Sequence, residues 1–150
     1  MFCHSTSFCL YFAPTQMNGA EYLSISSCSQ SLSGTYPIHF YSGNQRVDNT
    51  NSSMNNAYQN SGIGITSPSS FTSSHCTFSN NNVFDSICIG FYSTSGTISM
   101  SFANIVHNNS PSLGIEYIQG TGSRKMMYCI FHSNQNYLFC VYSGSLEVHI

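Results

Sequence analysis

Charged residues are nearly missing from this chain. Of its 150 residues, only three are Lys or Arg and five are Asp or Glu. This is 5% of the chain, against roughly 25% in an average soluble protein. The chain is therefore no disordered polyelectrolyte, and it lacks the basic patch that a phosphate backbone demands. We expect a surface of Ser, Asn, Thr and Gln and no nucleic-acid partner.

Long apolar runs and good helix formers are also scarce. No window reaches the roughly eighteen apolar residues of a membrane-spanning helix, so no membrane span is expected in this chain. The first residues, MFCHSTSFCLYFAPTQ, lack the basic start and unbroken apolar run of a signal peptide. Ser, Asn, Thr, Gly, Tyr, Phe and Ile predominate over the residues that favour helices.

The seven cysteines include no Cys-x-x-Cys pair. They form either a disulfide framework with one thiol left over, or a set of buried thiols that act as small apolar side chains. We favour the second interpretation, because most of them adjoin Phe, Ile or Leu, and their redox state stays open. The residues are Cys3, Cys9, Cys28, Cys76, Cys88, Cys129 and Cys140.

What the chain does contain is a succession of short β-like runs. SICIGFY, TISMSFA, MMYCIFH and YLFCVY are examples, and turn sequences such as SNNN, STSG and QGTGS separate them. The pattern predicts an all-β chain that forms one domain over residues 1–150. The segment 44–56, which includes DNTNSSMNN, is expected to be a looser loop.

The clearest repeats lie in residues 71–150, at an interval of 25 residues. A shift by this interval places His107 on His132 and Val106 on Phe131. Several short strands in each such period are typical of a solenoid, in which stacked coils bring equivalent residues to a spacing of about 4.8 Å. Like side chains should then form columns in the interior and an amide ladder at a corner. The expected apolar column is Phe78, Val106 and Phe131, and the expected ladder is Asn81, Asn109 and Asn134.

The motif Phe-x-x-Asn resembles that of the chlamydial polymorphic outer-membrane-type proteins and of similar Ser/Asn-rich protist surface proteins. Residues 78–81 and 131–134 fit it, and 106–109 fit it with Val in place of Phe. The companion Gly-Gly-Ala-Ile motif is missing, and SGIGI at 61–65 is a poor match to it. The resemblance implies a right-handed parallel β-helix, pectin-lyase-like, of about five to six coils. It also implies a non-enzymatic scaffold for adhesion or recognition, with a carbohydrate or a host protein as partner.

Neither end of the sequence looks like a polar cap, because MFCHSTSF and SLEVHI both resemble parts of a coil. We therefore expect a fragment of a longer solenoid, or association of chains end to end. The compartment stays open, although a longer version would be expected at the cell surface or outside the cell.

Few residues suggest chemistry. Pectate lyases and polygalacturonases share the β-helix fold, but they need clustered carboxylates, which this chain lacks. We expect neither enzymatic activity nor a cofactor. One alternative is an inactive fragment of a carbohydrate-active β-helix enzyme, and another is a free-standing β-sandwich.

Two sets of residues are candidates for a site. His107 and His132 would stack on neighbouring coils and could share a zinc or copper ion, but no third ligand is evident and a polar corner is favoured. Tyr92, Tyr117 and Tyr142 recur at the same interval. If they face outward they form an aromatic contact strip for sugar rings or a partner protein; packing in or at the rim of the core is favoured.

Overall fold

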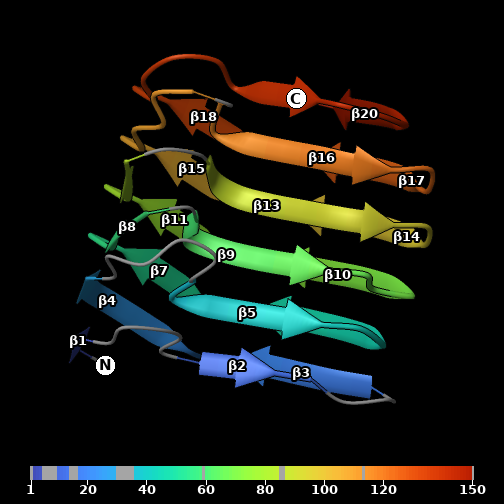
Figure 1. Cartoon of the computed structure of the whole chain (residues 1–150), viewed down its shortest axis with the longest axis horizontal. Helices are drawn as coiled ribbons and strands as arrows, with labels where there is room; N and C mark the ends of the chain where they lie inside the picture. Colours follow the sequence, from blue (N-terminus) through green and yellow to red (C-terminus); the bar gives the residue numbers. More distant parts are fainter. Residues whose placement is uncertain are drawn as a thin grey trace.

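The chain forms a parallel β-solenoid of about five turns, as the sequence predicts, and the described residues include no helix. Successive turns stack along one axis, with the N-terminal and C-terminal turns at opposite ends of the stack (Figure 1). The computed structural model describes residues 2–4, 10–13, 17–29, 36–58, 60–84, 87–112 and 114–149.

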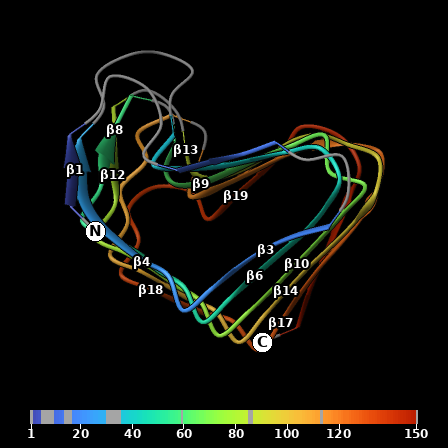
Figure 2. The same cartoon turned by 90° about the horizontal axis from the view of Figure 1, so that it is seen from below.

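Three parallel sheets, named A, B and C here, form the sides of the solenoid. Seen along the stack, the turns superimpose on one three-sided outline (Figure 2). Sheet A contains β1 (Phe2–His4), β4 (Ser24–Ser29), β7 (Asn51–Ser53), β8 (Asn56–Ala57), β11 (Thr77–Ser79), β12 (Asn82–Val83), β15 (Asn104–Val106) and β18 (Ile130–His132). Sheet B contains β2 (Leu10–Phe12), β5 (Ile38–Tyr41), β9 (Asn60–Thr66), β13 (Ile87–Thr94), β16 (Glu116–Gly120) and β19 (Phe139–Val141). Sheet C contains β3 (Met17–Glu21), β6 (Asn44–Asp48), β10 (Ser70–Ser74), β14 (Thr97–Ser101), β17 (Ser123–Met127) and β20 (Ser145–His149).

Alternation along each strand divides the side chains between interior and exterior. In β14, Ile98 and Met100 are buried, whereas Thr97 is exposed. Ile98 pairs with Phe71 of the preceding turn, so the interior side chains form columns along the axis. One turn alone would leave its apolar side chains exposed to water. Stacking buries them, and each large side chain that is fully buried stabilises the fold by about 1.5–3 kcal/mol.

The interval between equivalent residues is 26 or 27 in the central turns, not the predicted 25. In sheet A, Phe78 pairs with Ile105, and Ile105 pairs with Phe131. Because neighbouring residues of a strand face opposite sides, a register error of one residue moves a side chain to the other face. The prediction for Val106 is therefore wrong: it pairs with His132 on the outside, and the fully buried Ile105 takes its place in the column.

The segment 44–56 is not the loop that its composition predicts. It contains β6 and β7 and the first residue of β8, all paired in register with the next turn. Ser52 occupies the interior position that Phe78 holds one turn later. It is fully buried, and its hydroxyl donates a hydrogen bond to the carbonyl oxygen of Gly62 at 3.0 Å. A polar residue is tolerated in this column because its hydrogen bond is satisfied.

Candidate functional site

An amide ladder runs along the inside of the corner that follows β7, β11, β15 and β18 of sheet A. The backbone N–H of Asn81 donates to Oδ1 of Asn108 at 3.0 Å, and that of Asn108 donates to Oδ1 of Asn134 at 2.9 Å. Asn55 continues the ladder below Asn81, with the same contact at 3.1 Å. Asn108 also donates from Nδ2 to the carbonyl oxygen of Phe78 at 2.8 Å. The ladder thus joins consecutive turns through buried, satisfied amides.

Two of the three residues predicted for the ladder lie in it, but Asn109 does not. Asn109 belongs to a second, outer ladder, where its Nδ2 donates to Oδ1 of Asn82 at 2.8 Å. Asn82 donates in the same way to Asn56 at 3.0 Å. The true interval of 26 residues places Asn108 beneath Asn134 in the inner ladder. Adjacent asparagines therefore serve two parallel ladders.

His107 and His132 lie next to each other on the outside of the same corner, on neighbouring turns. Their ring centroids are 5.8 Å apart, with the ring planes at 75°, and the backbone N–H of His107 donates to the carbonyl oxygen of His132 at 3.0 Å. This is an edge-on contact between two exposed rings at a polar corner. No group of three or more His, Cys, Asp or Glu side chains in the described part of the chain is placed to hold a metal.

The three predicted tyrosines do not form one column. Tyr117 pairs with Gly90, and Tyr92 lies two positions further along β13. Their rings nevertheless meet on the outer face of sheet B, with centroids 5.5 Å apart, because Gly90 has no side chain to separate them. Tyr142 follows β19 and is 73% exposed. The structure therefore brings two of these rings together, both half-buried.

Two further rings, Tyr36 and His39, lie beside Tyr92 and were not predicted from the sequence. Tyr36 stacks on His39 with centroids 4.3 Å apart and meets Tyr92 edge-on at 6.3 Å. Its ring fills the space above Gly64, where an added Cβ would lie 2.3 Å from Cδ1 of Tyr36. His39 is buried against Thr66, with Nε2 and Oγ1 3.0 Å apart, and burial lowers its pKa to about 4. These rings cover the sheet, and His39 is neutral at pH 7.

A row of side chains, which we call the corner ridge, follows the corner between sheets C and A. It consists of Tyr22, Asn49, His75, Phe102 and Tyr128, each one residue beyond a sheet C strand. All five have a left-handed backbone, with φ between 48° and 55°. The rings of His75 and Phe102 stack at 5.1 Å and 11°, and those of Phe102 and Tyr128 at 5.3 Å and 17°.

The backbone conformation of the corner ridge is unfavourable for most of the residues that adopt it. A left-handed backbone costs most residues about 1–2 kcal/mol, whereas Asn, as at position 49, adopts it readily. Phe102 is nevertheless 48% exposed, Tyr128 62% and Tyr22 79%, so burial compensates only in part. The same left-handed backbone occurs at the other corners, as at Ser67, so it is a feature of the turns, and the exposed rings are what distinguish this row.

Hydroxyl groups and a few paired charges make up the outer face of sheet C beside the ridge. Asp48 carries an ion pair with Arg46 and accepts a hydrogen bond from Ser74 at 2.7 Å. Burial raises the pKa of Asp48, but these partners outweigh it and hold the pKa below its usual value. Lys125 and Glu147 pair at 3.7 Å. The columns of hydroxyls are Ser70, Thr97 and Ser123; Thr72 and Ser99; and Ser74 and Ser101.

An acidic side chain lies inside the solenoid. Glu116 pairs with Ile89 of the preceding turn and Phe139 of the following turn, in an interior column of sheet B. It is 1% exposed, and its Oε1 has no hydrogen-bond partner among the described residues. Burial raises the pKa of Glu116 to about 8, so the carboxyl group is largely protonated at pH 7. In the interior it cannot act on a polymer bound outside.

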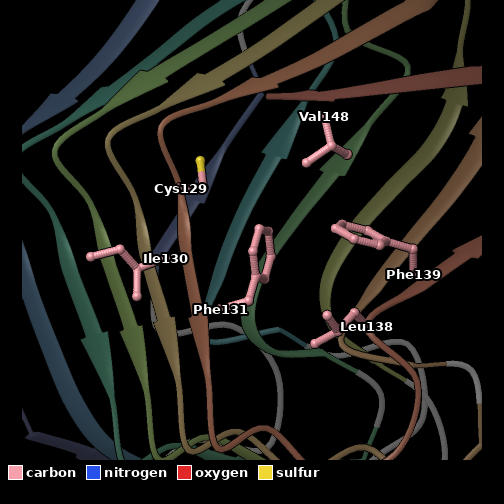
Figure 3. Close-up of a pocket in the computed structure, with 6 residues that line it drawn as sticks. All are labelled: Cys129, Ile130, Phe131, Leu138, Phe139 and Val148. Carbon is pink, nitrogen blue, oxygen red and sulfur yellow. The ribbon is translucent and has the colours of Figure 1, made fainter. Parts of the chain in front are cut away.

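One turn beyond Glu116, the last turn forms a half-open apolar cavity of about 340 Å³. Phe131, Phe139 and Val148 point toward a common space in Figure 3. The two phenylalanine rings meet edge to face at 5.2 Å. The six lining residues are Cys129, Ile130, Phe131, Leu138, Phe139 and Val148.

Five cysteines have described side chains, and no disulfide joins any two of them. Cys28, Cys76, Cys88 and Cys129 are buried, and Cys140 is half-buried. This placement suits the interpretation of buried thiols as small apolar side chains. Burial raises the pKa of Cys88 to about 12, because no charge compensates for the loss of water around a thiolate.

Alkylation should separate the buried thiols from the accessible one. At pH 8, iodoacetamide is expected to modify Cys140 more than about tenfold faster than Cys88, because the thiolate is the reactive form. Peptide mass spectrometry of the native chain at timed intervals gives both rates. Equal rates in the folded chain would contradict the burial of Cys88, and the unfolded chain in urea provides the reference at which the rates converge.

These observations define the class of the protein. It is a parallel β-solenoid with amide ladders at one corner, a strained aromatic row at another and a nearly uncharged exterior. No protein-family model, curated protein or solved structure matches the chain. In the ranges that the structure describes, no helix is long and apolar enough to cross a membrane.

Proposed function

We propose that this protein is a non-enzymatic recognition scaffold, part of a surface or secreted repeat protein. The stacked turns provide a rigid support, and the polar exterior contacts the partner. Kinship with right-handed β-helix proteins of the polymorphic outer-membrane type is part of this proposal. It is supported by the Phe-x-x-Asn motifs at 78–81 and 131–134, whose asparagines both stand in the inner amide ladder.

The observation that carries the proposal is the corner ridge. The rings of His75, Phe102 and Tyr128 are exposed, stacked on one another and fixed by a left-handed backbone, so a ligand would bind them with little loss of side-chain entropy. Aromatic rings beside Ser and Asn side chains are typical of recognition surfaces, where the rings supply contact area and the polar groups supply hydrogen bonds.

An uncharged carbohydrate is the ligand that this surface fits best. A sugar ring has an apolar C–H face, which packs on aromatic rings, and hydroxyls, which bond to Ser, Thr and Asn. Phe102 lies next to the hydroxyl column of Ser74 and Ser101. The charges on this side are mostly engaged with one another, as in the pair of Lys125 and Glu147, so binding by charge attraction is disfavoured.

The separation of Asp48 from Glu116 supports a non-enzymatic role. Glycoside cleavage requires two carboxyl groups on either side of one bond. Asp48 is held by Arg46 and Ser74 on the exterior, and Glu116 faces the interior of sheet B. These two residues therefore do not face a common substrate.

Replacing Phe102 by asparagine should separate ligand binding from stability. Asn49 holds the equivalent position two turns earlier, with φ of 48°. Relief of backbone strain should therefore offset the lost stacking energy to within about 1 kcal/mol. Binding to neutral polysaccharides, measured by affinity electrophoresis on cellulose, chitin and mannan derivatives, should weaken more than about tenfold.

Tyr137→Asn is the matched control, since Tyr137 is 73% exposed and lies outside the corner ridge. This variant and the natural chain should bind alike, and 1 M salt should leave the affinity unchanged. Affinity that disappears in salt would contradict an uncharged contact. If no polysaccharide binds, the carbohydrate proposal fails, and a protein becomes the partner to test next.

A further inference from the structure

The apolar interior column around Glu116 accommodates a neutral carboxylic acid far better than a charged carboxylate. Its neighbours in that column are Ile89 and Phe139. Its backbone N–H is bonded to the carbonyl oxygen of Leu138 at 2.9 Å, so the strand is fixed and the side chain stays inside. A buried carboxylate without a cation or hydrogen bonds is strongly unfavourable.

Among the residues that the structure describes, no charged side chain forms an ion pair with Glu116. The inward titratable groups are Cys88 in sheet B, Cys129 at the corner after sheet C, and Arg124 in sheet C, whose Nη1 donates to the carbonyl oxygen of Gly122. Burial and the charge of Glu116 both raise the pKa of the Cys129 thiol, which places the carboxyl group near it. The other titratable groups on these strands face outward: Tyr117 and Cys140 in sheet B, Lys125, Glu147 and His149 in sheet C, and His132 in sheet A.

The part of the chain that covers Glu116 is paired to the preceding turn in all three sheets, but its apolar side chains are only partly buried. We call it the terminal coil; it comprises residues 128–149, with β18, β19 and β20. Its core side chains, Phe131, Phe139, Leu146 and Val148, are only partly buried, and the apolar cavity lies between them. Segments with few fully buried contacts open locally before the whole fold does.

We propose that the proton on the Glu116 carboxyl group holds the terminal coil on the solenoid, and that loss of this proton to solvent releases the coil. The carboxylate becomes hydrated when residues 128–149 detach, which exposes the edges of β15, β16 and β17. The column of Ile63 and Ile89 in the preceding turns contains no ionisable group, so those turns stay closed.

Hydrogen exchange followed by mass spectrometry tests this proposal on the full chain. Protection of residues 128–149 is compared with that of residues 60–84 at pH 6.5 and pH 9.5, after correction for the intrinsic pH dependence of exchange. In the natural chain, protection of the terminal coil should fall at least about tenfold at pH 9.5, while residues 60–84 keep theirs.

Glu116→Gln, which cannot ionise, should keep the terminal coil protected at both pH values. Glu116→Ile, matched to Ile89, should do the same and guards against a folding defect in the first variant. Glu147→Gln removes an exposed carboxylate from the same coil and should retain the natural response. Unchanged protection in the natural chain, an equal loss in Glu116→Gln, or a parallel loss in residues 60–84 would each overturn the proposal.

Discussion

Replacing Glu116 by glutamine is expected to raise the free energy of unfolding by about 5 kcal/mol at pH 9 and to leave it nearly unchanged at pH 4. The pKa of this carboxyl group is about 8 in the folded chain, above its ordinary value of 4.5. Below pH 4.5 both states are protonated. Between pH 4.5 and 8 the unfolded state loses its proton while the folded state keeps it, so natural stability falls by about 1.4 kcal/mol per pH unit.

Urea denaturation at a series of pH values measures this effect. The difference between Glu116→Gln and the natural chain should grow from pH 4.5 to pH 8 and then stay constant. Glu147→Gln is the control, because Glu147 is exposed and paired with Lys125. If the curves for Glu116→Gln and the natural chain run parallel, Glu116 is not the buried acid described above.

Replacing Asn108 by alanine is expected to destabilise the chain by about 4 kcal/mol. The side chain accepts a hydrogen bond from Asn81 and donates to Phe78 and to Asn134. Each buried partner that is left unsatisfied costs about 1–3 kcal/mol, and no solvent reaches this corner to replace Asn108, which is fully buried.

The adjacent Asn109→Ala is the matched control, since it removes the same side chain from the outer ladder. Asn109 donates to Asn82 at a half-buried position, where water can take over, so the loss should stay below about 1 kcal/mol. Urea midpoints for the two variants provide the comparison. Equal losses would mean that the inner ladder adds nothing beyond the outer one.

The architecture could be predicted because it depends on features that survive small errors. The sequence contains short β-branched and aromatic runs, turn residues between them and a period of twenty to thirty residues. These features predict stacked coils whatever the register between the coils. The contact of His107 with His132 and that of Tyr92 with Tyr117 also follow from stacking alone, since rings reach across one or two positions.

Register could not be predicted with the same certainty. Identities at 25 residues favoured Val106 over Ile105 and Asn109 over Asn108, although the sheets pair at 26 and 27. In a sequence where Asn follows Asn and apolar residues adjoin one another, neighbouring alignments score almost equally. Only backbone pairing decides between them, and an error of one residue exchanges inside for outside.

The corner ridge and Glu116 were missed for the same physical reason. The ridge residues Tyr22, His75 and Phe102 share no common residue type, so only the correct register aligns them. The burial of Glu116 could not be predicted from composition, because charged residues are rarely buried. Glu116 pairs with the buried Ile89, and this register shows that its side chain points into the interior.

The direction of the backbone hydrogen bonds has a mechanical consequence. In all three sheets they join one turn to the next, and the ends of the chain lie at opposite ends of the stack (Figure 1). A force that draws these ends apart therefore loads only the outermost turn, whose bonds break before those of the next. With about 26 residues in a central turn, each rupture of a central turn should lengthen the molecule by about 90 Å, and the shorter last turn should give a smaller step.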